Sequence, residues 1–133
     1  MTDDIRPADP RGLRDARRVD YASDLNEEQL AAVMHPGGPM LVLAGAGTGK
    51  TRTLVDRAGR LIEDGVPPGQ ILLLTFTNKA AREMLDRVSQ LVERDAGRVH
   101  GGTFHSAGHR ILRRYAEQVG YTPRFSILDR EDA

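Results

Sequence analysis

The sequence predicts an α/β fold in which helices flank a parallel sheet. Residues 40–44 and 71–76 are two short, continuous apolar runs, a pattern typical of strands that are buried on both faces. Each run is followed by a longer segment with apolar residues at helical spacing, over residues 54–62 and 81–92. This alternation is typical of right-handed βαβ units, whose strands are parallel.

The chain has 133 residues, which is enough for one domain of the usual size. The 19 basic residues balance the 19 acidic ones, so the bulk field does not attract polyanions. The absence of cysteine excludes disulfide scaffolds, zinc knuckles and thiol nucleophiles. The sequence contains no apolar run of membrane-spanning length and its start is too polar for a signal peptide, so we expect a cytoplasmic protein with no membrane partner.

The sequence divides into a leader and one domain segment. Residues 1–24 contain few large apolar residues and are expected to form a flexible leader. Residues 25–133 carry the periodic pattern and the motifs described below. Within them, residues 71–115 contain eight basic and four acidic residues, a net charge of +4, so the basic residues concentrate there.

The helices are expected in the following order. Asn26 is a good N-cap for a helix to about residue 34, which the sequence His-Pro-Gly-Gly stops. Gly65 and two prolines end the helix over residues 54–62, and Asn78 is expected to cap the next one, closed by Gly97. A fourth helix ends at Gly120 and has apolar positions at Ile111, Leu112, Tyr115 and Val119.

Two further strands are predicted less strongly than the first two. Residues 99–104 form a weaker strand pattern because Gly101 and Gly102 interrupt it. Residues 125–128 form a short apolar run after the fourth helix, and Asp129 is expected to cap one more helix.

The turn after the first expected strand carries a phosphate-loop pattern. It matches G-x-x-x-x-G-K-[ST] except for Ala in place of the first Gly. Glycines let consecutive N–H groups face an anion, and the following helix points its positive end there. Lys50 is placed to reach the β- and γ-phosphates and Thr51 to ligate Mg²⁺. The pattern therefore predicts a P-loop NTPase site for ATP and Mg²⁺, and the alternative is a Gly-rich turn without a ligand. The residues of the predicted site are Ala44, Gly45, Ala46, Gly47, Thr48, Gly49, Lys50 and Thr51.

Three other segments accompany this loop in a fixed order. They are LNEEQ at residues 25–29, LTFTNKAA at 74–81 and GTFHS at 102–106. Together with the loop they resemble the N-terminal end of UvrD/PcrA/Rep-type superfamily 1 DNA helicases, over residues 25–133. The resemblance implies a partial RecA-like domain of a 3′-to-5′ DNA helicase. Such an enzyme hydrolyses ATP with Mg²⁺ while acting on single-stranded DNA and 3′-tailed duplex DNA, in a longer chain.

The resemblance also implies roles for residues on either side of the loop. Gln29 is expected to read adenine, and a Gln side chain has the donor and acceptor for a bidentate pair with adenine. The alternative is a capping box in which Gln29 pairs with Asn26. Arg52 is expected to stack on the base, the alternative being a solvated helix residue.

The two later motifs are expected to contact single-stranded DNA. The resemblance implies this contact for the first of them, which ends a predicted strand, where open α/β sheets bind ligands. The second lies at the end of the next predicted strand and is expected to continue the same surface. A stacking aromatic ring, donors to phosphate and a positive charge would serve it. The alternatives are that Phe76 is a core aromatic and that Asn78 is a plain N-cap. The residues concerned are Phe76, Thr77, Asn78, Lys79, Thr103, Phe104 and His105.

Other features favour ordinary structural roles. His105 and His109 are spaced i, i+4 but lack the Glu of a metalloprotease helix, so we do not expect a metal site there. Arg110, Arg113 and Arg114 are more typical of a solvated helix face than of a phosphate track.

The sequence lacks the acidic Walker B motif that a complete helicase of this family needs, and it lacks a second RecA-like domain. No apolar run ending in Asp-Glu occurs in it. Two hypotheses remain. The chain is the N-terminal piece of a helicase, inactive by itself and poorly stable, which its end within a capped helix favours. Alternatively, it is a stand-alone nucleotide- or DNA-binding module without turnover.

Overall fold

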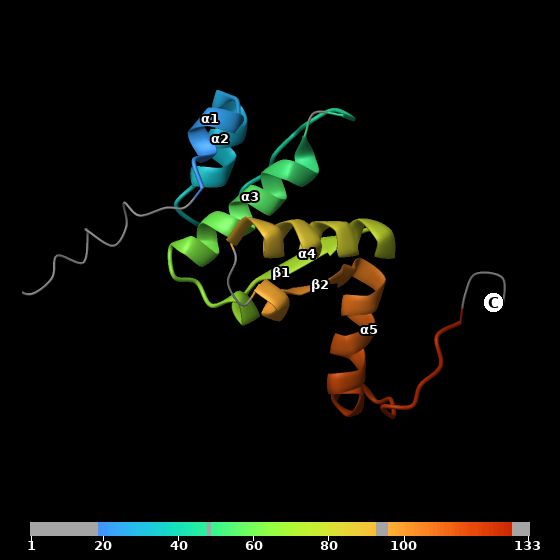
Figure 1. The fold of residues 1–133 in the computed structure, drawn as a ribbon. Coiled ribbons are helices and arrows are strands. Elements are labelled where there is room, and N and C mark those ends of the chain that lie inside the picture. The colour runs from blue at the N-terminus through green and yellow to red at the C-terminus, as the bar shows by residue number, and fades with distance from the viewer. Residues whose placement is uncertain (1–18, 48, 93–95, 129–133) are drawn as a thin grey trace, which may run out of the picture.

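A computed structural model describes residues 19–47, 49–92 and 96–128 of the chain (Figure 1). The described part is an α/β arrangement of helices around a small parallel sheet. Its elements in chain order are α1 (Tyr21–Asp24), α2 (Glu27–Met34), α3 (Lys50–Glu63), η1 (Pro68–Gln70), β1 (Leu72–Thr75), α4 (Asn78–Val92), η2 (Ala96–Arg98), β2 (His100–Thr103), α5 (Phe104–Tyr115) and η3 (Ala116–Val119).

The sheet consists of β1 and β2, which are parallel. The register aligns Leu72 with His100 and Thr75 with Thr103, and α4 provides the crossover between the strands. The predicted strands at residues 71–76 and 99–104 are therefore confirmed in slightly shorter form, as is the βαβ unit. Because both strands run in the same direction, Thr75 and Thr103 end at one edge of the sheet.

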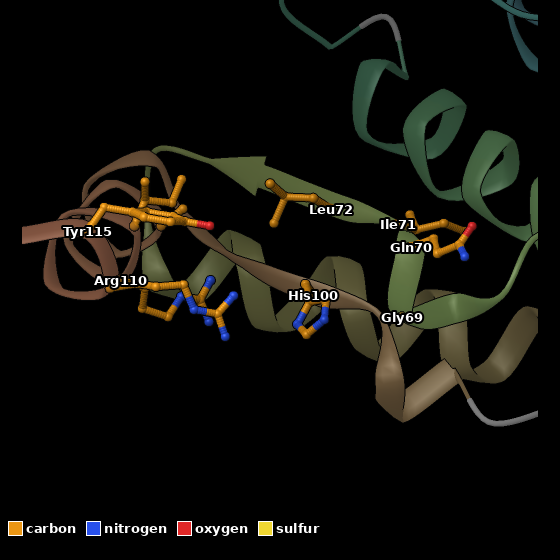
Figure 2. A pocket seen from close by; sticks show the side chains of 10 residues that line it. Gly69, Gln70, Ile71, Leu72, His100, Arg110 and Tyr115 are labelled. Atoms are coloured by element: carbon orange, nitrogen blue, oxygen red, sulfur yellow. The ribbon is translucent and has the colours of Figure 1, made fainter. Parts of the chain in front are cut away.

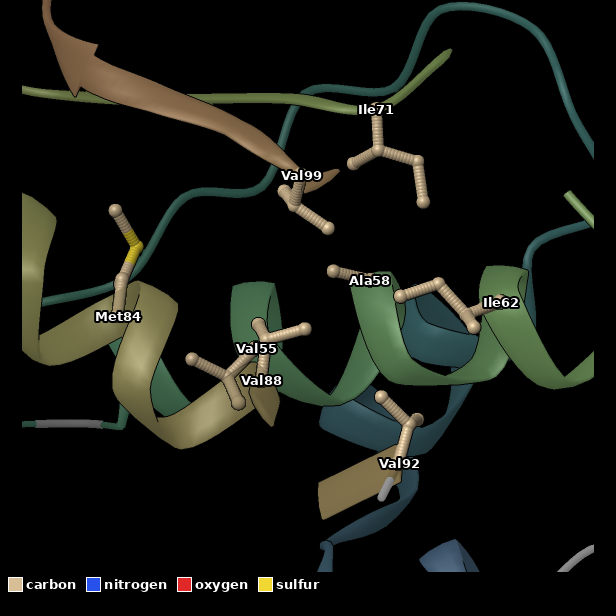
Figure 3. Close-up of a cluster of buried hydrophobic side chains, with 8 residues drawn as sticks. All are labelled: Val55, Ala58, Ile62, Ile71, Met84, Val88, Val92 and Val99. Carbon is tan, nitrogen blue, oxygen red and sulfur yellow. The ribbon is translucent and has the colours of Figure 1, made fainter. Parts of the chain in front are cut away.

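The main core lies where α3 and α4 pack against each other and against one face of the sheet (Figure 3). Val88 of α4 is fully buried at its centre. Gly101 of β2 allows close packing here, since an added Cβ would lie 2.6 Å from Leu85 Cδ1. The interruption that weakened the strand pattern is thus a packing position. The buried cluster comprises Val55, Ala58, Ile62, Ile71, Met84, Val88, Val92 and Val99.

The strand predicted over residues 40–44 is wrong for this structure. The segment is not paired with a strand, and its Leu41 and Leu43 are 83% and 86% exposed. A buried parallel strand needs hydrogen-bonded neighbours, whereas β1 and β2 pair only with each other in the described residues. The strand predicted over residues 125–128 is wrong for the same reason, and the cap predicted at Asp129 lies outside the described residues.

The packed region begins earlier than the predicted boundary at residue 25. The helix α1 lies within the expected leader, and its Tyr21 is 4% exposed. The Tyr21 hydroxyl donates a hydrogen bond to Oε2 of Glu63 at 3.2 Å, which ties α1 to the end of α3. Tyr21 also packs with Leu25 and Val33 in a second buried cluster. The last residues of the expected leader are therefore part of the fold.

Most helix boundaries agree with their sequence signals. Asn26 caps α2, Gly65 follows α3 with a φ of +97°, and Gly120 follows η3 in the left-handed region. The expected cap of α4 is wrong by one residue: Oγ1 of Thr77 accepts from the N–H of Ala80 at 3.1 Å. Thr77 can act as the cap because its hydroxyl reaches the third N–H of the helix. None of the described helices is long and apolar enough to cross a membrane.

Candidate functional site

The Gly-rich turn leads directly into α3, whose first residue is Lys50. Gly47 and Gly49 have φ values of +75° and +79°, a region that L side chains rarely adopt, and this explains the need for glycine at both positions. Position 48 lies outside the described residues. Gly49 occupies the N-cap position without a side-chain cap, so the first N–H groups of α3 receive no side-chain acceptor from that residue.

A cavity of about 730 Å³ lies beside this turn, between α2, residues 38–45 and the first half of α3. Its lining includes Gln29, Ala44, Gly45, Lys50 and Arg57. The volume is in the range of small-molecule sites. Uncapped N–H groups, left-handed glycines and an exposed Lys50 form a donor set suited to phosphate, so these residues fit a nucleoside triphosphate. Thr51 follows at the exposed start of α3, where a hydroxyl suits Mg²⁺.

Gln29 links α2 to the Gly-rich turn. Its backbone N–H donates to Oδ1 of Asn26 at 2.8 Å, and its Oε1 accepts from the N–H of Asn26 at 3.1 Å. The capping box considered from the sequence is therefore present. A Cβ added at Gly49 would lie 2.9 Å from Nε2 of Gln29. The amide nitrogen thus lies against the turn while the oxygen caps the helix, and the adenine contact stays a prediction.

Arg52 forms ion pairs with two carboxylates. Neither Arg52 nor these two carboxylates line the cavity. Its guanidinium lies 3.3 Å from Asp24 of α1 and 3.7 Å from Asp56 of α3. Burial raises the pKa of Asp56, with Arg52 acting in the opposite direction and Asp24 reinforcing the rise. Stacking of Arg52 on a base stays a prediction and would require these ion pairs to rearrange.

Two aromatic rings meet where the parallel strands end. Phe76 follows β1 and is 85% exposed, whereas Phe104 opens α5 directly after β2 and is 52% exposed. Their ring centroids are 5.5 Å apart at an interplanar angle of 41°. Phe76 is therefore not the core aromatic considered as an alternative. The pair forms an exposed apolar platform at the edge of the sheet where open α/β folds bind ligands.

The other predicted DNA contacts divide into exposed and buried residues. Thr77, Asn78, Lys79 and His105 are exposed and lie close to Phe76 or Phe104 in the sequence. Thr103 is buried, and its Oγ1 accepts from the N–H of Ser106 at 3.1 Å as the N-cap of α5. Its side chain is thus directed into the fold, which corrects its place on the expected surface.

The histidines form no metal site in the part of the chain that the structure describes. Nε2 of His109 accepts from Nε of Arg113 at 2.8 Å, and the His109 ring packs edge-on against Phe125. A second cavity of about 550 Å³ lies between the sheet and α5 (Figure 2). Sequence reasoning missed this cavity, because its Arg110 and Arg114 were read as a solvated helix face. Its lining also includes Gln70, Leu72, His100 and Tyr115.

Comparison with known proteins places the chain in a family. Residues 25–133 match the UvrD/REP helicase N-terminal domain. The chain is 47% identical over 107 residues to the ATP-dependent DNA helicase PcrA of Leuconostoc citreum, covering 79% of this chain and 14% of that protein. It is 48% identical over 109 residues to the ATP-dependent DNA helicase PcrA of Staphylococcus aureus, which covers 81% of this chain and 15% of that protein. It is 47% identical over 110 residues to PcrA of Staphylococcus epidermidis, which covers 82% of this chain and 15% of that protein.

The chain therefore belongs to the UvrD/REP helicase N-terminal domain family. It spans about 15% of the length of the curated relatives that it matches. The α/β arrangement with a two-stranded parallel sheet is consistent with a P-loop NTPase fold. The resemblance drawn from the four motifs is thereby confirmed.

Proposed function

We propose that this chain is the ATP-binding portion of a 3′-to-5′ DNA helicase. In the complete protein, hydrolysis of ATP would drive translocation on single-stranded DNA and unwinding of 3′-tailed duplex DNA. The observation that carries the proposal is the uncapped start of α3, which follows two left-handed glycines and begins at Lys50, a residue that lines a cavity of nucleotide size. The naming of the relatives as ATP-dependent DNA helicases supports it.

The nucleotide site would use residues of the turn and of α2. The backbone of residues 44–49 would surround the phosphates, Lys50 would neutralise their charge, and Thr51 would hold Mg²⁺. When bound, Mg²⁺ supplies charge neutralisation at the phosphates. Gln29 would pair with adenine through its amide, since its Nε2 already lies against the turn. Arg52 would stack on the base after leaving Asp24.

The DNA site would use the platform of Phe76 and Phe104. All four bases can stack on an exposed aromatic ring, which suits an enzyme that moves along single strands of any sequence. Lys79, Asn78 and His105 are exposed and close in sequence to the two rings, and they would contact the phosphates. The exposure of Phe76 supports this role, because a structural aromatic at the end of a strand would be buried.

We further propose that the isolated chain does not hydrolyse ATP. Phosphoryl transfer in P-loop enzymes needs a Walker B carboxylate at the metal, and the sequence contains no apolar run ending in Asp-Glu. Hydrolysis by the purified chain that is lost in Lys50→Ala would contradict this part of the proposal. Binding of nucleotide and DNA without turnover in a naturally complete chain of this length would favour the stand-alone module.

The two lysines of the chain provide the test of the two sites. Lys50 lies at the nucleotide cavity and Lys79 at the start of α4 beside the aromatic platform. Lys50→Ala should weaken binding of MgATP by about 100-fold, the value of a strong charge-assisted contact, and leave binding of a deoxythymidine oligonucleotide unchanged. Lys79→Ala is the matched substitution and should weaken only the oligonucleotide. Fluorescence titration measures both ligands, and loss of both in either variant would contradict separate sites.

A further inference from the structure

Arg57 of α3 makes an unusual set of contacts with the end of α2. Its Nη1 lies 3.0 Å from the carbonyl oxygen of Ala32, 3.2 Å from that of Val33 and 2.9 Å from that of His35. Arg60, one turn further along α3, adds a contact of 3.2 Å to the His35 carbonyl. The last carbonyls of a helix have no partners within it and carry its negative dipole end. Since α2 has no basic residue in its own last turn, α3 supplies the cation.

The other end of α2 carries Gln29. The amide nitrogen of Gln29 lies against Gly49, the residue that opens α3. The short helix α2 therefore meets α3 at two places: Gln29 lies close to Gly49, and Arg57 is hydrogen-bonded to the carbonyls at the end of α2. A hydrogen-bonded helix of eight residues moves as a rigid unit about 12 Å long, so a shift at one end displaces the other.

We propose that Arg57 is a positioning residue for recognition of the nucleotide base. By holding the carbonyl end of α2 to α3, it fixes Gln29 at the distance from the Gly-rich turn that separates the adenine from the phosphates. This proposal rests on the proposed function, because it assigns to Gln29 the base and to the turn the phosphates. Arg57 lines the cavity, but its guanidinium is directed at backbone oxygens of α2.

The test compares the base with the phosphates, because a merely structural role would not separate them. MgATP, MgGTP and inorganic tripolyphosphate are titrated by NMR into the 133-residue chain. The unmodified chain should prefer MgATP to MgGTP by about tenfold, the discrimination expected of one bidentate pair.

Arg57→Met should lose this preference while keeping its affinity for tripolyphosphate. Arg57→Lys retains a cation for the carbonyls and should keep part of the preference. Arg87→Met, an exposed arginine of α4, is the matched control and should change nothing.

A second measurement follows Gln29 without any ligand. In the unmodified chain the side-chain amide protons of Gln29 should show a nuclear Overhauser effect to Gly49, and Arg57→Met should abolish it while the signals of Val88 in the core stay in place. An unchanged preference for ATP in a folded Arg57→Met, or equal weakening of all three ligands, would overturn the proposal. If the unmodified chain bound neither MgATP nor tripolyphosphate, the proposed function would fail. The Gln29–Gly49 contact would then decide separately whether Arg57 positions α2.

Discussion

The helix α3 starts differently from α4 and α5, which follow the two strands of the sheet. Gly49 supplies no side-chain cap to α3, and it has a φ of +79°. The hydroxyls of Thr77 and Thr103, by contrast, each accept from an N–H in the first turn of α4 and α5. An uncapped N-terminus keeps its donors available for an external anion, whereas a capped one satisfies part of them internally.

This difference separates two kinds of ligand chemistry within one short chain. At α3 the absence of side chains exposes the backbone, which suits phosphate. At α4 and α5 the threonine caps fix the helix starts and leave Phe76 and Phe104 side by side on the surface, which suits the flat faces of bases. The chain thus presents backbone at the start of α3 and aromatic rings beside the starts of α4 and α5. Substitutions that impair phosphate binding at α3 should leave base stacking on the two rings intact, and the reverse should also hold.

Gly49→Ala should produce the largest effect among the substitutions that test this comparison. The alanine has to adopt a left-handed backbone, and its Cβ would displace the Gln29 amide, which lies 2.9 Å from that position. The cost of about 2 kcal/mol corresponds to about a thirtyfold loss of tripolyphosphate affinity, measured by calorimetry. Gly69→Ala is the matched control, because an added Cβ there meets nothing within 4 Å. A Gly49→Ala chain that binds tripolyphosphate normally would show that the turn is not the phosphate site.

Phe76→Ala should have the next largest effect, on the other ligand. Loss of one stacked base costs about 1–3 kcal/mol, so affinity for a single-stranded oligonucleotide should fall by about tenfold in a fluorescence anisotropy titration. Stability should change little, because the ring is 85% exposed. Phe76→Tyr keeps a stacking ring and should bind nearly as well. If Phe76→Ala lowered the melting temperature strongly and Phe76→Tyr failed to bind, the ring would have a structural role instead.

The sequence predicted the helices and the two paired strands because their signals are local. Val55, Ala58 and Ile62 lie on one helical face and enter the core, and Asn26 and Gly120 act at the helix ends as their types predict. The strand at residues 40–44 was mispredicted because an apolar run reports only that a segment can be buried. Whether it becomes a strand depends on neighbours that supply hydrogen bonds, and Leu41 and Leu43 have none on the described sheet.

The candidate site likewise combines features that could be predicted from local sequence with features that could not. The Gly-rich turn was predictable, since its glycines and Lys50 are consecutive in sequence and each has a direct chemical reason. The link from Arg57 to the carbonyls of Ala32 and His35 was not, because any residue has a carbonyl and the partners are more than twenty positions apart. The burial of Thr103 was equally hidden, since a threonine at the end of a strand is compatible with either a cap or a surface contact.

The smallest expected effect comes from the two threonine caps, and it sharpens the comparison between them. Thr103→Ala should lower the free energy of unfolding by about 1 kcal/mol, because it leaves the N–H of Ser106 without its acceptor in a buried setting. Thr77→Ala should cost less, because water replaces the hydroxyl at its exposed position. Thr103→Ser and Thr77→Ser keep the acceptor oxygen and should restore most of the loss. Urea denaturation measures all four variants. Equal losses at the two positions would mean that burial does not strengthen the cap, and no loss at either would mean that α4 and α5 start as freely as α3.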